Sequence, residues 1–271
     1  MRPHFRHAGP VPASRAASAG VPGSGCRHKA GMTSLALALL LANPAAAQTQ
    51  AAAFARDRMY MSATGRSLIV GVDRLDYSKG LPERFAGYER FLAQHPDRRG
   101  LVYMLQIAPP SREKVDTYQE IRAALDGLSG RINGEYADID WTPLRYVNKG
   151  YPRPELAGVY RAARVGLVTP LRDGMNLVAK EFVAAQDPRD PGVLILSRFA
   201  GAAAQMTDAV LVNPYSADEM SEAILRALTM PREERIRRWE SLIDCVRRED
   251  VHWWCDLFLD ALEDADVAAV A

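Results

Sequence analysis

Two basic residues, Arg74 and Lys79, flank a tight turn that follows the apolar segment 68–72. The helix predicted to begin after Gly80 leaves backbone N–H groups without intrahelical acceptors, and such groups favour a bound anion. Two cations beside a positive helix end suit a diphosphate group. The alternative is a surface cluster in which the two cations pair with Asp73 and Asp76, and the local sequence fits both interpretations.

A third cation, Arg112, follows the next apolar segment, 101–107. Pro109 and Pro110 end that segment, Ser111 can cap a helix, and Arg112 falls in the first turn. A cation at a helix N-terminus opposes the helix dipole, at a cost that a bound anion would offset. The local alternative is an arginine that pairs with a nearby carboxylate.

The most polar of the three loops follows a strand that ends at Thr169. An Asp-Gly turn begins at Asp173, and a helix begins near Asn176. Backbone N–H groups of 174–178 would then face a ligand, and Asp173 could accept hydrogen bonds from sugar hydroxyls. Glu181, one turn inside the helix, could accept both hydroxyls of a ribose. The alternatives are an ordinary Asp-Gly turn and a plain first-turn acid at Glu181.

Alternating short apolar runs and longer segments with helical periodicity must position these loops. Strands are predicted at 68–72, 101–107, 144–147, 165–169, 193–196 and 210–212. Helices are predicted at 81–94, 111–128, 154–161, 177–185, 217–229, 232–248 and 251–262. This alternation predicts an α/β fold, a mostly parallel sheet with helices on both faces. Ligands of such sheets bind at the carboxyl ends of the strands, where the three loops lie.

Composition and motifs exclude several classes of function. Hydrophobic residues at 48% and charged residues at 25% are ordinary globular values. The net charge is +1, but residues 1–56 hold no Asp or Glu, so the remainder is mildly acidic, which argues against a nucleic-acid-binding body. There is no GxGxxG or P-loop motif, no Cys/His metal spacing and no Ser/His/Asp set at the loops.

The first 56 residues differ in composition from the rest. Residues 1–31 are rich in Gly, Pro, Ala, Ser, Arg and His, which predicts disorder. Segment 32–47 has the apolar stretch and Ala-x-Ala site of a secretory signal, but the stretch is shorter than the ~20 residues that span a bilayer. It could also be a buried or frayed helix, or a spurious extension translated from upstream DNA. We therefore expect a disordered, low-complexity segment at 1–56 and a folded domain at 57–271.

Together these segments resemble the UDP-forming trehalose-6-phosphate synthases of glycosyltransferase family 20. The resemblance is carried by VDRLDYSKGLPER (72–84), QIAP with Ser111 and Arg112, GRING (130–134) and LVTPLRDGMNLVAKE (167–181). Shorter matches are AAQD (184–187), FAGA (199–202), VNPY (212–215) and RALTM (226–230). The resemblance implies a Rossmann-like domain, the C-terminal, donor-binding half of a two-domain GT-B glycosyltransferase.

It also implies an activity, which is transfer of glucose from UDP-glucose to glucose 6-phosphate with retention of configuration. The products are α,α-trehalose 6-phosphate and UDP, and neither a metal nor a cofactor is required. Family members are thought to use front-face attack, in which the leaving phosphate oxygen takes the acceptor proton. No enzymic nucleophile is then needed, in agreement with the absence of a nucleophile motif here.

The matched motifs assign roles to individual residues. Arg74 and Lys79 would bind the diphosphate and neutralise its charge as UDP leaves. Ile107 and Val178 would bracket the uracil, and Glu181 would hold the ribose hydroxyls.

The same motifs place the transferred glucose and the acceptor. Asp173, which with Arg74 and Lys79 forms the catalytic set, would hold the glucose together with the backbone of Gly174, Met175 and Asn176. Leu177 belongs to the same substrate-binding stretch, and Arg112 would reach the 6-phosphate of the acceptor.

The chain differs from the family in how much of the family's length it matches. It covers only the donor half, from about residue 66 to residue 262, so we expect a truncated chain whose acceptor domain comes from a separate polypeptide or a homo-oligomer. A catalytically inactive module that binds UDP or UDP-glucose is the alternative. The apolar helix 251–262 would pack locally, pair with another chain or leave an exposed patch. The cytosolic substrates imply a cytoplasmic protein without membrane or nucleic-acid partners, and they favour the spurious extension over a signal peptide.

Overall fold

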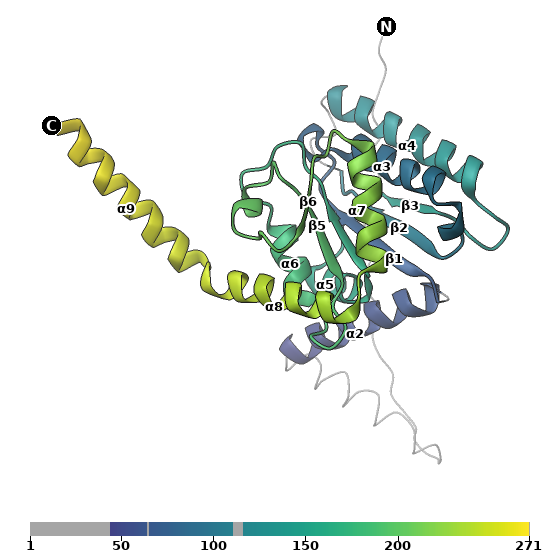
Figure 1. Ribbon diagram of the computed structural model, residues 1–271, viewed down its shortest axis with the longest axis horizontal. Coiled ribbons are helices and arrows are strands. Elements are labelled where there is room, and N and C mark those ends of the chain that lie inside the picture. Colours follow the sequence, from purple (N-terminus) through teal and green to yellow (C-terminus); the bar gives the residue numbers. More distant parts are fainter. Residues whose placement is uncertain (1–43, 64, 111–115, 271) are drawn as a thin grey trace, which may run out of the picture. The chain divides into compact units, whose positions relative to one another are not determined.

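The computed structural model describes residues 44–63, 65–110 and 116–270, and its strands form one parallel sheet. The sheet has the order β3-β2-β1-β4-β5-β6 (Figure 1). The strands are β1 (Ser67–Val72), β2 (Val102–Ile107), β3 (Leu144–Val147), β4 (Val165–Val168), β5 (Val193–Ser197) and β6 (Val210–Val212). Strand order reverses between β1 and β4, and such a switch point opens a crevice at the carboxyl ends of the strands.

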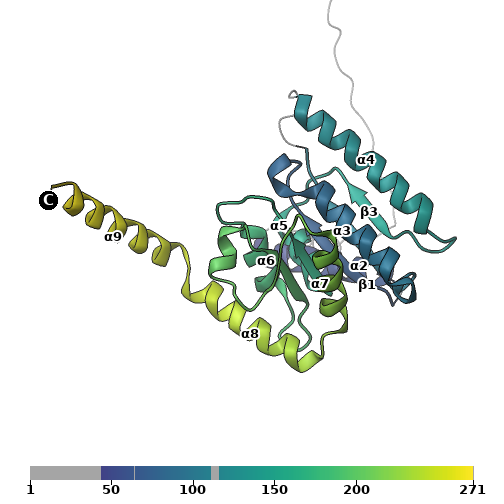
Figure 2. The same ribbon diagram turned by 45° about the horizontal axis from the view of Figure 1, so that its top comes forward.

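Helices cover both faces of this sheet, which confirms the predicted α/β class (Figures 1 and 2). One face is covered by α3 (Leu81–Gln94), α4 (Asp116–Tyr136) and α7 (Ala217–Thr229). The other face is covered by α2 (Pro44–Ala63), α5 (Arg153–Ala162), α6 (Leu177–Ala185) and α8 (Arg232–Arg248).

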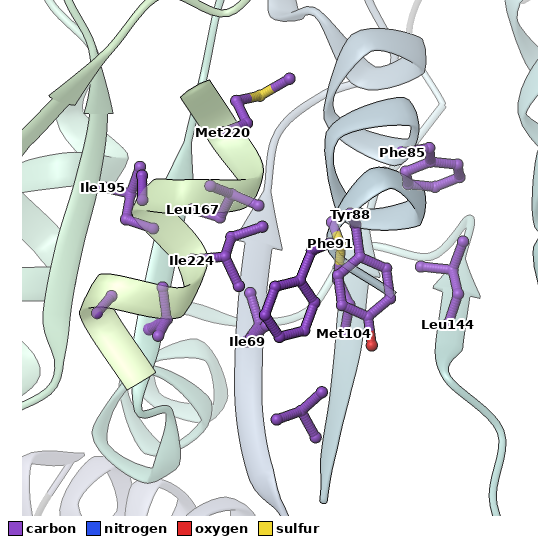
Figure 3. Close-up of a cluster of buried hydrophobic side chains, with 14 of the residues drawn as sticks. Ile69, Phe85, Tyr88, Phe91, Met104, Leu144, Leu167, Ile195, Met220 and Ile224 are labelled. Carbon is purple, nitrogen blue, oxygen red and sulfur yellow. The ribbon is translucent and has the colours of Figure 1, made fainter. Parts of the chain in front are cut away.

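The alternation of side chains along each strand separates two apolar cores. Ile69 and Met104 point toward the face of α3 and α7, where Phe91 and Ile224 pack against them (Figure 3). Their neighbours in the strands, such as Leu68, point to the opposite core. Because both faces are buried, the central strands are continuous apolar runs rather than alternating ones.

Most predicted elements are confirmed, several with the predicted bounds, including α3, α6, α7, α8, β3 and β6. Helix α4 extends beyond the predicted end at residue 128 to Tyr136, because the glycines of the GRING segment do not interrupt it. Residues 111–115 lie outside the described part of the chain, so the predicted cap Ser111 and the predicted phosphate ligand Arg112 are not placed.

The N-terminal part of the fold corrects our expectation for residues 44–56. We expected a disordered, low-complexity segment up to residue 56, with a buried or frayed helix as one alternative for 32–47. Helix α2 begins at Pro44 and continues through that boundary. Ala55 and Ala63 are buried, and α2 packs against α5. Alanine has the highest helix propensity of any residue, so a low-complexity alanine run becomes a helix where a neighbouring helix can cover it. Residues 1–43, with most of the signal-like segment, lie outside the described residues.

The last helix, α9 (Val251–Val270), leaves its aromatic side chains exposed. Trp253, Trp254 and Phe258 are 37%, 48% and 50% exposed, and the rings of Trp254 and Phe258 stack with centroids 5.4 Å apart. The single chain therefore has an exposed apolar patch, which pairing of this helix with another chain would also require.

Candidate functional site

The loop after β1 is fixed by its own hydrogen bonds. Asp76 caps a short 3₁₀ helix (Tyr77–Lys79), and its Oδ1 accepts from Ser78 N at 2.9 Å and from Ser78 Oγ at 2.8 Å. Tyr118 OH donates to the other carboxylate oxygen at 3.1 Å. Burial opposes ionisation of Asp76, but these hydrogen bonds hold its pKa below the usual range. The carboxylate thus fixes the turn that carries Lys79.

The loop after β4 lies directly against this turn. Ser78 O accepts hydrogen bonds from Leu171 N at 2.8 Å and from Arg172 N at 3.3 Å. Gly80 has φ 63°, and a Cβ at this position would lie 2.7 Å from Thr169 O. Glycine is therefore required here both by the left-handed backbone and by the close approach of the strand end.

An ion pair joins the two loops. Lys79 Nζ lies 2.5 Å from Asp173 Oδ2, and the two side chains are only 16% and 15% exposed. The sequence assigned both residues to the site from separate motifs, and the structure brings them together at the switch point between β1 and β4. A cation and a hydrogen-bond acceptor thus lie side by side where a ligand of this fold binds.

The N-terminus of α6 completes this side of the crevice. Asn176 adopts φ 73°, the left-handed region, and its Oδ1 accepts from Ala179 N at 3.3 Å as the helix cap. Its Nδ2 donates to Asp173 Oδ2 at 3.1 Å, while Met175 N donates to Asp173 Oδ1 at 3.4 Å. The first turn of α6 contains no acidic residue, so beyond the cap and the neighbouring Asp173 carboxylate its positive end favours an anionic ligand.

The loop after β5 supports the same segment from behind. Asp173 N donates to Phe199 O at 3.3 Å, Gly201 N donates to Asp173 O at 3.0 Å, and Ala202 N donates to Met175 O at 2.8 Å. A Cβ on Gly201 would lie 2.0 Å from Gly174 O. The small residues of this loop thus permit close backbone approach.

The remaining predicted site residues lie around the same edge. Arg74 is exposed, and it forms no ion pair with any residue that the structure describes. Ile107, at the end of β2, lines a cavity of about 190 Å³ between the sheet, α2 and α5. Val178, Leu177 and Glu181 lie on α6, and Glu181 is in its second turn, so the interpretation as a first-turn acid is wrong.

The alternative of a surface ion-pair cluster is also wrong. Asp73 pairs with Arg84, at 2.7 Å between Oδ2 and Nη1, rather than with either predicted cation, and Asp76 serves as a cap. Burial raises the pKa of Asp73, and the neighbouring guanidinium opposes that effect. Sequence analysis did not identify Arg84 as a site residue, because an arginine normally faces solvent.

Two negative findings concern only the described residues. Between Pro44 and Val270, the described parts hold no cluster of three or more His, Cys, Asp or Glu side chains that could bind a metal ion. No helix in those parts is long and apolar enough to cross a membrane.

Comparison with known proteins gives a consistent result. The sequence profile of Glycosyltransferase family 20 matches residues 49–264. The trehalose-6-phosphate synthase of Sodalis glossinidius is 55% identical over 196 residues, and that of Sinorhizobium fredii is 54% identical over 197 residues. These alignments cover 72% and 73% of the chain but only 42% of each relative, so the chain spans about two fifths of the length of these relatives.

Solved structures agree. An α,α-trehalose-phosphate synthase (UDP-forming) from Burkholderia xenovorans, in complex with glucose-6-phosphate, has a TM-score of 0.74 and 53% identity over 76% of this chain and 46% of that one. An E. coli structure bound with UDP-2-fluoro glucose has a TM-score of 0.73 and 47% identity over 79% of this chain and 49% of that one.

Proposed function

The chain belongs to glycosyltransferase family 20, and from this we propose that it binds UDP-glucose and serves in the transfer of glucose to glucose 6-phosphate. The product is α,α-trehalose 6-phosphate, formed with retention of configuration. The observation that carries the proposal is the meeting of Lys79 and Asp173 beside the free N-terminus of α6. These groups supply a cation, a hydroxyl acceptor and backbone donors at one point of the crevice.

The diphosphate binds to cations from the loop after β1. Arg74 is exposed and without an ion-pair partner among the described residues, so its whole charge is available to a ligand. Lys79 shares its proton donors between Asp173 and the phosphate. As the bond to the leaving UDP breaks, negative charge develops on the phosphate oxygen, and the two cations stabilise it. We propose that they take the part that a divalent metal takes in other transferases, so that neither a metal nor a cofactor is required.

The nucleoside binds between the ends of β2 and α6. Ile107, at the buried end of β2, and the half-buried Val178 of α6 bracket the uracil. Glu181, half-buried on α6, accepts the two ribose hydroxyls. This placement orients the diphosphate toward Lys79 and the first turn of α6.

The transferred glucose lies against the loop after β4. Asp173 and the backbone of Gly174, Met175 and Asn176 hold its hydroxyls, with Leu177 beginning the helix beneath. The hydrogen bonds from Met175 N and Asn176 Nδ2 keep the Asp173 carboxylate in one orientation. Attack occurs from the same face as the leaving group, and the leaving phosphate oxygen takes the proton of the acceptor hydroxyl. No side chain is then required as a nucleophile.

The acceptor requires groups beyond the described residues. Arg112, which we assign to the 6-phosphate, lies outside them, and the described part of the chain forms one Rossmann-like domain. We propose that other acceptor groups come from a segment outside the described residues, from a separate polypeptide or from a second copy of the chain. Because both substrates are cytosolic metabolites, the chain acts in the cytoplasm.

The test is formation of trehalose 6-phosphate from UDP-glucose and glucose 6-phosphate, followed by chromatography. The assay uses the purified chain, alone and with the acceptor-binding domain of a family 20 relative added in excess, in the presence of a metal chelator. We expect little product without the added domain, because catalysis needs both substrates in attack geometry. Product should form with the domain present and disappear in Asp173→Ala. A chain that binds UDP-glucose but gives no product with the added domain would instead be a binding module.

A further inference from the structure

Arg84, a residue without an assigned role, is buried beneath the site. It lies in the first turn of α3 and its side chain has no exposed surface. Its Nη1 lies 2.7 Å from Asp73 Oδ2 and donates to Gln106 Oε1 at 3.0 Å, while its Nε donates to Thr169 Oγ1 at 2.9 Å. One guanidinium therefore contacts three strands, because Asp73 follows β1, Gln106 lies in β2 and Thr169 follows β4.

Each of these acceptors stands beside a residue of the proposed donor site. Asp73 precedes Arg74, and Gln106 precedes Ile107. Thr169 begins the loop that carries Asp173. The guanidinium is planar, with donors at fixed angles, so its two hydrogen bonds to Gln106 and Thr169, together with its ion pair with Asp73, restrict the relative position of all three partners at once.

Stability alone is a weak explanation for this arrangement. Burying an ion pair costs solvation free energy for both charges. Well-packed apolar residues at the same positions often stabilise a core at least as much as the ion pair does. The pair of Arg84 and Asp73 is almost completely buried, with 0% and 2% of the side chains exposed. What the pair supplies that an apolar contact would not is directional geometry at the strand ends.

We propose that Arg84 is a positioning residue of the donor site. It holds the carboxyl ends of β1, β2 and β4 in the relative positions that allow Lys79 to pair with Asp173. It thereby sets the affinity for the nucleoside diphosphate without touching it. This inference rests on the proposed function, since it concerns the same site.

A second buried arginine provides a matched control. Arg235 of α8 is 7% exposed; it donates to Asp190 Oδ1 at 2.7 Å, to Met230 O at 3.3 Å and to Pro191 O. Asp190 and Pro191 precede β5, and Met230 precedes α8. All three lie away from the carboxyl edge of the sheet. Both arginines are buried and contact one carboxylate and two further acceptors, but the carboxylate of Arg235 is 51% exposed and its other acceptors are backbone carbonyls. The main difference between them is their place in the fold.

The experiment measures UDP affinity by calorimetry on the full chain and on Arg84→Lys, Arg84→Met, Arg235→Lys and Arg235→Met. All titrations are made well below the Tm of each variant. Both methionine variants should lower Tm, but only the Arg84 variants should weaken UDP binding, by about 10-fold or more for Arg84→Met. Arg84→Lys should lie between, since lysine keeps the charge beside Asp73 but not the planar set of donors.

Two further variants separate positioning from a loss of folding. Thr169→Val removes one acceptor and leaves the ion pair, and it should weaken UDP binding about fivefold. In a chain that already carries Lys79→Ala, Arg84→Lys should weaken UDP binding less than it does in the parent. The reason is that Arg84 acts on the affinity by positioning Lys79.

The outcomes are distinct. If the parent binds UDP while Arg84→Lys and Thr169→Val bind it within twofold of the parent, Arg84 is structural only and the inference is wrong. Equal losses from the Arg84 and Arg235 variants would also overturn it. If the parent itself does not bind UDP, the proposed function fails and the inference fails with it.

Discussion

Lys79 Nζ and Asp173 Oδ2 lie 2.5 Å apart, and this contact links two loops whose residues are 94 positions apart in the chain. The two strands that precede these loops, β1 and β4, are neighbours at the switch point of the sheet. The ion pair therefore holds the crevice in shape before any ligand enters. A ligand phosphate can then accept the remaining ammonium protons of Lys79 without a large rearrangement.

The two cations of the loop after β1 should differ in what they do for stability. Arg74→Ala and Lys79→Ala should each weaken UDP binding by about 1.5–3 kcal/mol, the usual contribution of a hydrogen bond to a charged group. Only Lys79→Ala should also lower Tm, because Arg74 is exposed and forms no ion pair among the described residues. Calorimetry and thermal unfolding measure both effects. Arg237→Ala, at an exposed arginine of α8 away from this edge of the sheet, serves as the control and should change neither.

The cap of α6 should combine two separable contributions. Asn176→Gly keeps the left-handed backbone at little cost but loses the cap and the bond to Asp173. Asn176→Ala loses the same bonds and, unlike glycine, keeps a Cβ at φ 73°. We expect the alanine variant to be the less stable of the two by about 1 kcal/mol. Chemical denaturation measures the difference. Equal stability would show that the left-handed backbone at this position carries no strain.

Acid should weaken the loop after β1. The pKa of Asp76 is lower in the folded chain than its ordinary value of 3.8, so the carboxylate stabilises the fold above that pH. This contribution is lost as pH falls through the folded pKa. The difference in Tm between the parent and Asp76→Asn should therefore be constant near neutral pH and shrink below about pH 4. A difference that grows in acid would contradict the assignment of Asp76 as an ionised cap.

The contact between the loops after β4 and β5 should not tolerate an added methyl group. Gly201→Ala places a Cβ 2.0 Å from Gly174 O, so the two loops must separate. We expect the free energy of unfolding to fall by about 1–3 kcal/mol. The affinity for UDP-glucose should fall more than the affinity for UDP, since the affected loop holds the sugar. Gly127→Ala, in α4 where the methyl group meets no atom within 4 Å, should instead stabilise the chain by about 0.5–1 kcal/mol. An unchanged ratio of the two affinities in Gly201→Ala would contradict the role of this loop.

The sequence predicted the parts of the site that depend on local pattern. Apolar periodicity gave the bounds of α3 and α6, and the position of each loop at a strand end followed from the parallel sheet. The pairing of Lys79 with Asp173 was not predicted, because it depends on the sheet order that makes β1 and β4 neighbours. Nothing in the spacing of residues along the chain specifies that order.

Two other features escaped sequence analysis for physical reasons. The alanine-rich residues 44–56 form part of α2, which packs against α5 and buries Ala55. Composition alone does not reveal that neighbouring helix, so it predicts disorder. The buried position of Arg84 depends on three partners that lie in or directly after three different strands. A single arginine in a helical segment carries no local sign of such partners.

The most direct test of the donor-site assignment is calorimetric titration of the purified chain, first with UDP and then with glucose 6-phosphate. We predict saturable binding of UDP that is weakened in Arg74→Ala and in Lys79→Ala. Glucose 6-phosphate should bind weakly or not at all when added to the chain alone, since the described site supplies groups for the donor. A chain that folds but does not bind UDP, or one that binds UDP equally well without either cation, would contradict the account.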